Sequence, residues 1–563
     1  MRALILLVLA LLVSGCAAGP TPWDGPRLAD PRDALTVEDL LGGPLPPVLD
    51  TSYLARPAWA EGDGEPLAGV MDLDGGELEL DFARTRSRYP GEDRFPATSI
   101  ALASDGGRLV TRAVGERDPD SLWDVRVGTG AVWREAGDGG WNRGSFPIDL
   151  VDGVFNQVRN CVATFVYREG EASRAFVQCG QETADALDDQ IGDLHGFVPV
   201  DAGLAPLWDA EAMVEAQRVS QASRIPVHPL SEWDRDGELA ALFDRGRLTW
   251  APTSVGAVYD GGVLYVHPAM TRQGPHPYPD EMHHGVFSVT KSLAGALAMF
   301  AFAARYGDGI FEARITDHVP ALADRPEWQG VTFAHALDMA TGTWGGEDAG
   351  LLFEPLVLAG SADEALANIA ALGDAPEGAG EAFRYATTNT FVLSSALQHY
   401  VEEREGPGVR YWDLVRAEVL EPIGVYDLDL LTTHDDRPED RIPLLGFGAR
   451  PTLDQAARIA RLLTNEGEHD GRQLLHRGRV REALGRTGWD GLRVDGRLRY
   501  RHSFWSRTVR TGGCRTEVSF MQGHGGNHVL LLESGVVVFR FMDELDDDPA
   551  ALARAAERVK PSC

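Results

Sequence analysis

The chain has 563 residues, more than one ordinary domain accommodates, so at least two domains are expected. Hydrophobic residues make up 44% of it and charged residues 24%, a globular composition that excludes a disordered or collagenous protein. The formal net charge is −33 and the sequence has no basic run, which argues against binding nucleic acid or anionic lipid through charge.

The N-terminal segment has the features of an export signal. The apolar run 3–13 is too short to span a membrane, which is typical of a secretory signal peptide. The run ends in Leu12-Val13-Ser14-Gly15-Cys16, which resembles the bacterial lipobox, in which the chain is cleaved before the cysteine and the thiol is acylated. A plain signal peptide with an incidental cysteine is the alternative.

The lipobox predicts how the protein is attached. We expect a signal peptide over residues 1–15, acyl chains on Cys16, and a tether over 16–48 that is rich in Pro, Gly and Asp. The protein would then lie in the bacterial cell envelope, facing the periplasm or the exterior, with the membrane as a partner through the lipid.

Residues 49–181 have the pattern of a β-rich domain. Short apolar or alternating runs are separated by DGG, GDGG and REGE, which are turn sequences. Cys161 and Cys179 lie in two strand-like runs placed symmetrically about Gly170, so a hairpin would bring them opposite each other. Because exported proteins form disulfides, we predict a Cys161–Cys179 bridge, with free buried thiols as the alternative. No catalytic constellation occurs here, and the domain's role is open.

A second domain is expected after a connector over 182–234. Within 235–545, strands are predicted on both sides of Asp260-Gly261-Gly262 and again near the end of the region. Sheet segments at both ends with helices between them predict an α+β domain whose first and last strands pair. Helices are expected at residues 288–306, 333–339, 362–371, 392–403, 411–419 and 453–464.

The last segment, 546–563, is expected to be a C-terminal helix with a short tail. Cys514 and Cys563 pair by elimination once Cys161 and Cys179 are joined. That bridge would fasten the C-terminal helix to the second domain.

The lysine count singles out one position. Only two of the 52 basic residues are lysines, Lys291 and Lys560. Arginine can replace lysine as a surface charge, but it keeps its proton near neutral pH, so a position that needs a proton-accepting amine must stay lysine. Ser288 precedes Lys291 by three residues at the start of an apolar helix, so both project from one face. A neutral amine beside a hydroxyl can take its proton and make it a nucleophile.

Six segments follow one another along the second domain: FSVTK, VTFAHALDMATGT, FRYATTNTFVLSSAL, VLEPIGVYDLDL, GFGARPTLDQAARIARLLTNEGEHDGRQLL and GHGGNHVLLL. In this order and spacing they resemble the serine hydrolases related to class C β-lactamases, which include penicillin-binding-protein-like proteins and family VIII esterases. The resemblance covers about residues 239–542. It implies an antiparallel sheet flanked by helices, with an additional helical subdomain.

The resemblance implies a role for each motif residue. Ser288 is expected to be the acylated nucleophile, Lys291 its activating amine, and Tyr385 the group that relays protons. A phenolate beside a charged Lys291 can act as a base below the free tyrosine pKa of about 10.

The third motif of the family resembles His524-Gly525-Gly526, expected to form a strand edge beside the nucleophile. Its glycines would let the substrate approach the backbone closely. By the same resemblance, the N–H groups of Ser288 and Asn527 form the oxyanion hole.

Two departures from the family pattern bear on the substrate. Thr387 stands where most members have an asparagine that bonds the lysine and a substrate amide, and His524 stands where they have a lysine. A mostly neutral imidazole holds a substrate carboxylate less firmly than an ammonium does. Both changes favour an uncharged ester, or an amide, over a β-lactam or a D-Ala-D-Ala peptide.

The sequence therefore predicts an exported, lipid-anchored serine hydrolase that cleaves a small-molecule or peptide-like ester or amide. The alternatives are β-lactamase or D-Ala-D-Ala peptidase activity at the same site, and a catalytically inert envelope binding or scaffold protein. No cofactor, metal site or nucleic-acid partner is expected, because neither a metal-ligand spacing nor a dinucleotide or phosphate loop occurs in a suitable context.

Overall fold

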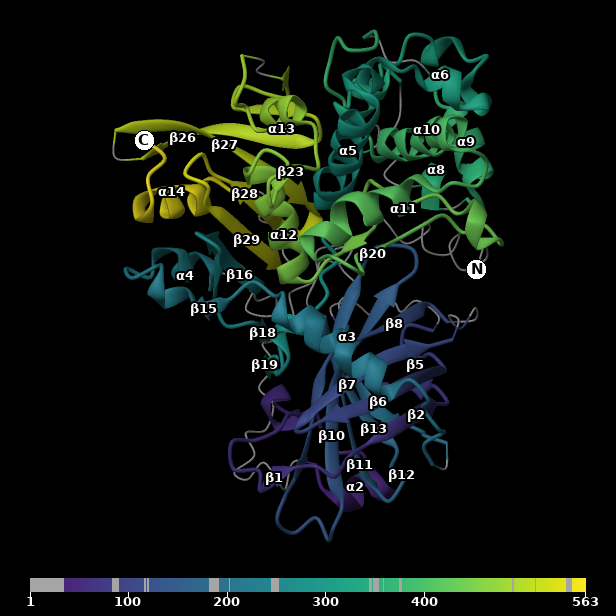
Figure 1. Cartoon of the computed structure of the whole chain (residues 1–563), viewed down its shortest axis with the longest axis vertical. Coiled ribbons are helices and arrows are strands. Elements are labelled where there is room, and N and C mark those ends of the chain that lie inside the picture. Colours follow the sequence, from purple (N-terminus) through teal and green to yellow (C-terminus); the bar gives the residue numbers. More distant parts are fainter. Residues whose placement is uncertain are drawn as a thin grey trace.

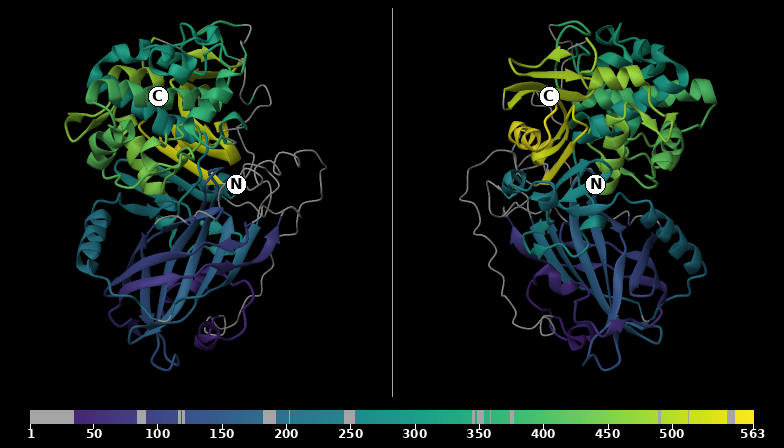
Figure 2. Two further views of the ribbon diagram at one scale, coloured as in Figure 1. Left: turned by 90° about the vertical axis from the view of Figure 1, so that its right-hand side faces the viewer. Right: turned by 60° about the vertical axis from the view of Figure 1, so that its left-hand side comes forward.

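The computed structural model describes residues 35–563, apart from residues 84–90, 116–117, 119–120, 182–191, 202, 245–252, 344–346, 348–353, 358, 374–376, 489–490, 512 and 543–548. Two domains, each built around a β-sheet, lie one above the other (Figures 1 and 2). Within the described residues, no helix is long and apolar enough to cross a membrane. The predicted signal peptide and Cys16 lie outside this part of the chain.

The first domain is a 12-stranded antiparallel sheet, as its alternating runs predicted. Its continuous order is β2 (Ala68–Leu73), β6 (Thr98–Asp105), β7 (Arg108–Val114), β9 (Gly130–Arg134), β10 (Asn142–Asp152), β11 (Val158–Arg168), β13 (Ala175–Gln181), β14 (Gly192–Val198) and β4 (Glu79–Ala83). Three strands pair beside this path: β1 (Gly62–Asp63), β8 (Trp123–Val127) and β12 (Glu171–Ala172). The central strands β10 and β11 are buried along almost their whole length. One face of β11 lies in the sheet's own core, and the other packs against an N-terminal segment.

The predicted tether over 16–48 is too long, because its last part belongs to the folded first domain. Residues 35–48 are folded onto the first domain, and α2 (Val37–Leu41) packs against β11. Leu35 and Leu40 are buried with Phe176 of the sheet. Leu35 precedes the N-cap residue Thr36 and Leu40 is the fourth residue of the helix, two positions whose apolar side chains pack together at a helix start. The part of the tether over 16–34 lies outside the described residues.

The predicted boundary of the connector is also wrong. Strand β14 falls within 182–234 but pairs with β13 and β4, so the first domain extends to about residue 200. The predicted connector also contains a helix, α3 (Ala210–Ala222), which covers β6 and β7 of the first domain (Figure 2). Met213 provides its buried contact with the sheet.

The second domain contains a nine-stranded sheet in which the first strand of the predicted region 235–545, β16, pairs with its last strand, β29, as predicted. Strand β16 runs antiparallel to β29, and the turn at Asp260-Gly261-Gly262 joins β16 to β17. All pairs are antiparallel except β15 with β17. The order is β15 (Val227–Pro229), β17 (Val263–Val266), β16 (Thr253–Asp260), β29 (Val537–Met542), β28 (Asn527–Leu531), β27 (Cys514–Gly523), β26 (Phe504–Thr511), β25 (Leu498–Arg501) and β24 (Leu492–Arg493).

Helices cover both faces of this sheet. Along β29, Val537, Phe539 and Phe541 face the core shared with the nucleophile helix, whereas Val538 faces the C-terminal helix. Helices α4 (Glu238–Phe243) and α14 (Ala550–Val559) lie on the second of these faces. The nucleophile helix is a π-helical turn, Lys291–Ala296, continued by α5 (Leu297–Tyr306), with α12 (Leu453–Thr464) beside it.

The helical subdomain implied by the family resemblance lies beside the sheet (Figure 1). The remaining helices are α6 (Ile315–His318), α7 (Phe333–Leu337), α8 (Glu354–Val357), α9 (Ala362–Ala370), α10 (Thr387–Glu405), α11 (Tyr411–Val415) and α13 (Arg477–Ala483).

Both predicted disulfides are present. Cys161 on β11 lies directly opposite Cys179 on β13, and their sulfur atoms are bonded. Cys514 at the start of β27 is bonded to Cys563, so the tail after α14 is fastened to the second sheet.

Candidate active site

The nucleophile motif lies at the start of the buried helix. Ser288 occupies the turn that leads into the π-helical segment, and Lys291 is only 1% exposed because the helix is apolar on all sides. The Nζ atom of Lys291 donates a hydrogen bond to Oγ of Ser288 at 2.8 Å. The structure therefore brings together the predicted nucleophile and its activating amine.

Lys291 is held by two further acceptors. Its ammonium donates to Oγ1 of Thr387 at 3.0 Å and to the carbonyl oxygen of Gly446 at 2.8 Å. Burial lowers the pKa of Lys291 from its usual 10.5 to about 8, partly opposed by the carboxylate of Glu347. A substantial fraction of the amine is therefore neutral in mildly alkaline solution and can accept the Ser288 proton.

Tyr385 completes the group, and its side chain hydrogen-bonds to Ser288. The Lys291 Nζ lies 4.8 Å from the centre of the Tyr385 ring. Burial, together with Tyr500 and Glu347, raises the Tyr385 pKa well above 10. The raised pKa favours a neutral phenol in the resting site over the phenolate that the sequence led us to expect, so Tyr385 is placed to donate a proton.

Thr387 contacts Lys291 from the position where the family resemblance implies an asparagine. Its hydroxyl accepts from Lys291 and donates to the carboxylate of Glu347, while its backbone N–H donates to Glu347 Oε2 at 3.0 Å. The carboxylate thus fixes the direction of the hydroxyl, which leaves an oxygen lone pair for the lysine. Asn389 makes no such contact with Lys291 or Glu347. Its Oδ1 accepts a hydrogen bond from the Thr341 hydroxyl at 3.2 Å.

Glu347 was not found by sequence reasoning. It comes from the segment after the second family motif, 40 residues before Thr387, and no spacing rule connects the two. A carboxylate after a Gly-Gly pair is an ordinary loop pattern. Only the folded chain shows that this side chain interacts with Thr387, Lys291 and Tyr385.

The third motif differs from the expected strand edge. His524–Gly526 forms a 3-10 turn between β27 and β28, in which Gly525 and Gly526 both have a φ of 77°. L side chains rarely adopt this conformation, so the motif needs its glycines for backbone geometry. The His524 ring packs edge-on against Phe287, with centroids 5.5 Å apart, beside the nucleophile.

The hairpin approaches the nucleophile segment closely at Gly523. A Cβ atom added there would lie 2.1 Å from the carbonyl oxygen of Val286, so only glycine fits. Asn527 follows the turn and is fully buried, with its side chain donating to the His524 carbonyl at 2.6 Å and accepting from the Met542 N–H at 3.2 Å. Its placement beside the motif is compatible with the predicted oxyanion-hole role of its N–H, which stays a prediction.

The first domain reaches this site through the turn between β10 and β11. Asn156 in that turn is fully buried, and its Oδ1 accepts from the backbone N–H of Phe287 at 2.8 Å. Its Nδ2 donates to the carbonyl oxygen of Ala449 at 3.1 Å. One side chain of the first domain therefore joins the residue before the nucleophile to the segment that follows Gly446.

A buried ion-pair network lies next to this contact. Asp429 pairs with Arg126 of the first domain and with Arg450 of the second, both at 2.9 Å. Arg450 also donates to the Asp152 carbonyl oxygen of the first domain. The two guanidinium groups hold the Asp429 pKa well below its usual range, so the carboxylate stays ionised at any working pH.

Among the described residues, no group of three or more His, Cys, Asp or Glu side chains is arranged to hold a metal ion. The adjacent His283 and His284 have separate surroundings. His283 Nδ1 contacts the Asp149 carboxylate at 2.8 Å, whereas burial lowers the pKa of His284 to about 3 and keeps it neutral.

Comparison with known proteins identifies the family of the second domain. A family model described as Beta-lactamase matches residues 242–558. No curated protein matches the chain.

Solved structures resemble part of the chain. The chain is similar to a penicillin-binding protein homolog from Caulobacter crescentus, with 18% identity, a TM-score of 0.43, and coverage of 60% of this chain and 98% of that one. It is similar to a family VIII carboxylesterase, with 17% identity, a TM-score of 0.43, and coverage of 59% and 98%. It is similar to a penicillin-binding protein from Bacillus halodurans, with 15% identity, a TM-score of 0.41, and coverage of 58% and 97%. Because the family model spans more than half of its length, the chain belongs to the Beta-lactamase family of serine hydrolases.

Proposed function

We propose that the protein is a lipid-anchored cell-envelope hydrolase that cleaves an uncharged ester through an acyl-enzyme at Ser288. The observation that carries the proposal is the 2.8 Å hydrogen bond between Lys291 and Ser288, made by an amine whose pKa burial lowers to about 8. A surface lysine would stay protonated and could not serve as the base.

The reaction follows from the order of proton affinities. Neutral Lys291 takes the hydroxyl proton as Ser288 Oγ attacks the substrate carbonyl carbon. The N–H groups of Ser288 and Asn527 are proposed to stabilise the oxyanion. Tyr385, which is hydrogen-bonded to Ser288, donates its proton to the leaving alcohol oxygen. The proton held by Lys291 then moves to the Tyr385 oxygen and restores the phenol. Water then attacks the acyl group with the same residues acting in reverse.

An apolar wall beside Tyr385 favours an uncharged substrate. The rings of Tyr385, Phe383, Tyr500 and Trp505 form one cluster, and their centroids lie 4.9 to 6.5 Å apart. Such a surface accepts an aromatic or aliphatic group and offers no charge to a carboxylate. The sequence provides no second lysine near the motifs, because Lys560 lies three residues from the C-terminus.

The test uses the full chain and Ser288→Ala, both assayed on a short-chain chromogenic ester and on a chromogenic cephalosporin. Ester turnover that the substitution abolishes supports the proposal. A fluorophosphonate probe should add one adduct to the native chain and none to Ser288→Ala, as read by intact mass. A folded native chain that the probe does not label would instead support the inert scaffold.

A β-lactamase or D-Ala-D-Ala peptidase is the second candidate, favoured by the hydrogen bond from Lys291 to Thr387. Through this bond, the threonine hydroxyl can accept from the lysine at the position where the family resemblance implies an asparagine. Cephalosporin turnover comparable to ester turnover would favour this candidate and contradict the preference for uncharged esters.

The activity should rise with pH through about 8. Lys291 is active only when neutral, and its pKa is lowered to about 8, so the protonated, inactive form dominates below that pH. We expect kcat/KM to increase about tenfold per pH unit well below the pKa and to level off above it. Initial rates between pH 6 and 9.5, corrected with Ser288→Ala at each pH, measure this. A flat profile over that range would exclude Lys291 as the titrating base.

The envelope anchor is tested separately. Metabolic labelling with a radioactive fatty acid should tag the native chain but not Cys16→Ser, and the substitution should move the protein from the membrane to the soluble fraction. Membrane attachment that survives the substitution would contradict lipidation at Cys16.

A further inference from the structure

The hairpin turn between β25 and β26 contains two residues in an unfavourable backbone conformation. His502 has a φ of 45° and Ser503 a φ of 68°, and the flanking Arg501 and Phe504 lie directly opposite each other. Two-residue turns with positive φ at both positions usually contain Asn-Gly, because most other side chains strain this conformation. The turn itself therefore gives no reason for histidine and serine. Both residues are only 2% exposed, so their contacts within the domain account for their presence.

The His502 ring lies between two carboxylates that come from different helices. Its Nδ1 is 3.2 Å from Oδ1 of Asp338, at the end of α7, and its Nε2 is 3.3 Å from Oε2 of Glu482 on α13. An ionised carboxylate only accepts hydrogen bonds, so both ring nitrogens carry a proton, as in an imidazolium. Burial disfavours this charge, but the two carboxylates outweigh it and raise the His502 pKa above its usual 6.5. His502 is therefore a charged link between α7 and α13.

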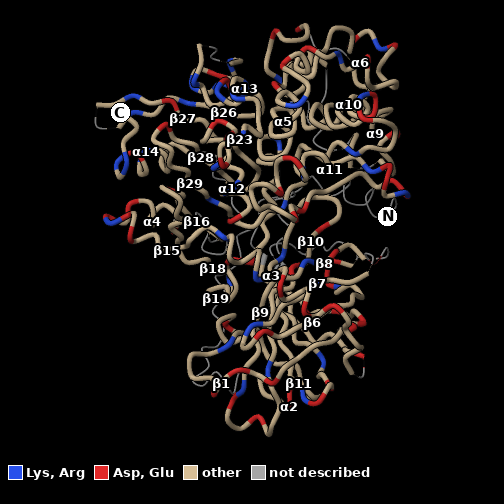
Figure 3. Tube along the Cα trace, in the orientation of Figure 1, with Lys and Arg blue, Asp and Glu red and all other residues tan. Residues whose placement is uncertain are grey.

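The other groups packed against the ring hold it in one position. Helix α13 carries residues of both charges (Figure 3), and its Arg479 donates to the same Glu482 Oε2 at 2.9 Å. The hydrogen bond from His502, together with Arg479, lowers the Glu482 pKa, so this carboxylate stays ionised. The rings of Phe300 and Phe311 pack edge-on against the imidazole, with centroids 6.2 and 5.0 Å away.

One side of the turn holds the residue next to Lys291. Ser292 follows Lys291 in the π-helical turn and is 1% exposed, and its Oγ donates to the Ser503 carbonyl oxygen at 2.6 Å. The Ser503 Oγ donates in turn to the Leu337 carbonyl oxygen of α7 at 3.1 Å. The turn therefore joins the nucleophile helix to α7.

The other side of the turn reaches the segment that carries Tyr385. The backbone N–H of His502 donates to Oδ1 of Asp338, the residue before Met339. Met339 is fully buried with a φ of 55°, and its carbonyl oxygen accepts from the Arg384 N–H at 2.7 Å. Arg384 directly precedes Tyr385. A displacement of Asp338 would therefore move the backbone that leads into Tyr385.

We propose that His502 is a positioning residue of the active site, whose charged ring keeps Lys291 and Tyr385 in place. Held between two carboxylates, the ring fixes the strained turn, and the backbone contacts on both sides of the turn transmit this order to the two catalytic side chains. The inference rests on the proposed function, because it assigns His502 to the same reaction at Ser288.

The test replaces His502 by glycine, which adopts the positive φ freely, so the turn keeps its shape without the ring. The readout is the rate at which the fluorophosphonate probe labels Ser288, which does not depend on the identity of the natural substrate. A displacement of about 1 Å at reacting groups can cost about 100-fold in rate, so labelling should slow about 10- to 100-fold. The pH midpoint of labelling should rise from about 8 toward 10.5, because a loosened helix admits water to Lys291.

Added imidazole separates positioning from general support of the fold. A cavity of about 400 Å³ is lined by His502, Asp338 and Glu482, so imidazole can reach the space that the ring leaves. Imidazole should restore labelling of His502→Gly at least about tenfold, the lower end of the expected loss. It should leave the native rate unchanged, which controls for its own reaction with the probe. His502→Asn is the second variant: asparagine suits the turn but cannot reach both carboxylates, so labelling should slow in a chain that keeps its hairpin.

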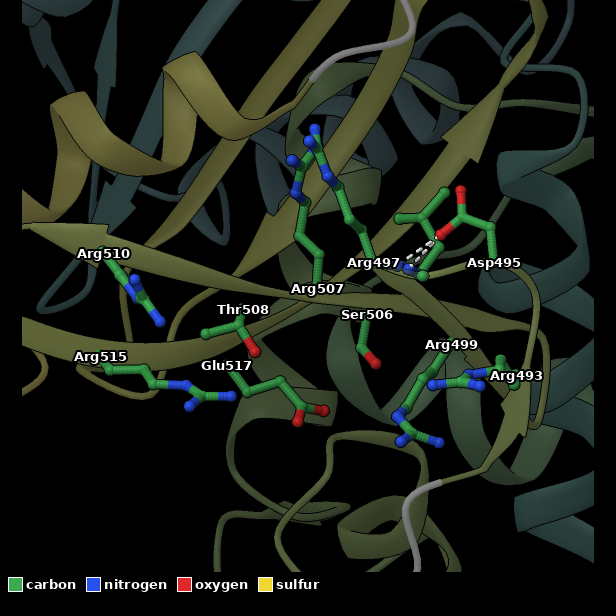
Figure 4. A pocket seen from close by; sticks show the side chains of 12 residues that line it. Arg493, Asp495, Arg497, Arg499, Ser506, Arg507, Thr508, Arg510, Arg515 and Glu517 are labelled. Atoms are coloured by element: carbon green, nitrogen blue, oxygen red, sulfur yellow. Dashed lines mark hydrogen bonds between the residues drawn. The ribbon is translucent and has the colours of Figure 1, made fainter.

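Two controls lie in the second domain. Gln398 on α10 is buried and bonds to the Val409 carbonyl oxygen and the Tyr411 N–H, so Gln398→Ala should lower the melting temperature without changing labelling or its pH midpoint. Arg510→Gln removes a positive charge farther along β26, where Arg510 is exposed and lines a groove (Figure 4). This substitution should also leave the labelling rate and its pH midpoint at the native values.

Slow labelling that imidazole restores, with a raised pH midpoint, supports the proposal. Native labelling rates in both His502 variants would overturn it. A loss that imidazole does not restore, with the midpoint still at about 8, would also overturn it, because His502 would then only support the fold. A native chain that the probe does not label contradicts the catalytic proposal itself, whereas a labelled native chain with unaffected variants contradicts the positioning role alone.

Discussion

Replacing Lys291 by arginine is expected to lower kcat/KM about 1,000-fold, the contribution typical of a positioned general base. Arginine keeps the positive charge and the hydrogen-bonding capacity, but it cannot give up its proton to become a base near neutral pH. The acceptors around Lys291, Ser288 Oγ and the Gly446 carbonyl oxygen, would face a permanent cation. The rate that remains should also lose its rise with pH through about 8, since that rise comes from Lys291.

The chain provides a matched control, its only other lysine. Lys560 is half-exposed and donates to Asp260 Oδ1 at 2.7 Å, a contact that arginine can make equally well. Lys560→Arg should therefore leave activity and melting temperature unchanged. Because the buried site has little room for a guanidinium, Lys291→Met serves as a second variant that keeps the length of the side chain and removes its charge. An active, folded Lys291→Met would rule out the assigned base.

The parts of this structure that could be predicted are those determined by residues close together in the sequence. Helix α12 begins and ends where predicted, because Thr452 caps its first turn and its apolar positions recur at helical spacing. Helix α10 begins at Thr387, five residues before its predicted start. Its first turn is made of buried threonines and Asn389, and such residues give no apolar periodicity to read.

The same distinction holds at the site. Ser288 and Lys291 are three residues apart on one helix, so their contact follows from helical geometry and needed no structure. Glu347 and Asn156 reach the site from distant segments that pack against it, and nothing in their local sequence distinguishes them from ordinary loop residues. The Tyr385 pKa was predicted in the wrong direction for a related reason, because burial depends on the packing of the whole domain.

Replacing Asn156 by glycine is expected to lower kcat about 10- to 100-fold with little change in KM. Asn156 has a φ of 68°, which glycine adopts freely, so this substitution removes the side chain without straining the turn. What is lost are the bonds to the Phe287 N–H and the Ala449 carbonyl oxygen, both buried. Phe287 itself has a φ of 44°, a conformation costly for a bulky side chain that surrounding contacts must maintain.

The reason for an effect on kcat is the position of these contacts. Phe287 directly precedes Ser288, and the segment that contains Ala449 also contains Gly446, whose carbonyl oxygen holds Lys291 at 2.8 Å. Loss of Asn156 therefore frees both sides of the Ser288–Lys291 pair, and a displacement of about 1 Å at reacting groups can cost about 100-fold in rate. The kcat from steady-state assays and the rate of fluorophosphonate labelling should both decrease in Asn156→Gly.

Asn160 provides a control that separates a role in positioning the nucleophile from a role in holding the two domains together. It lies on the same strand pair, is also buried, and makes two comparable bonds with the backbone of His283, at 3.1 and 3.2 Å. Its contacts are five residues from Ser288, so Asn160→Ala should lower the melting temperature as Asn156→Gly does but keep kcat near the native value. If both variants lower kcat equally, the first domain only supports the fold. If kcat decreases only in Asn156→Gly, the first domain positions the nucleophile. The second domain alone would then be an incomplete catalyst.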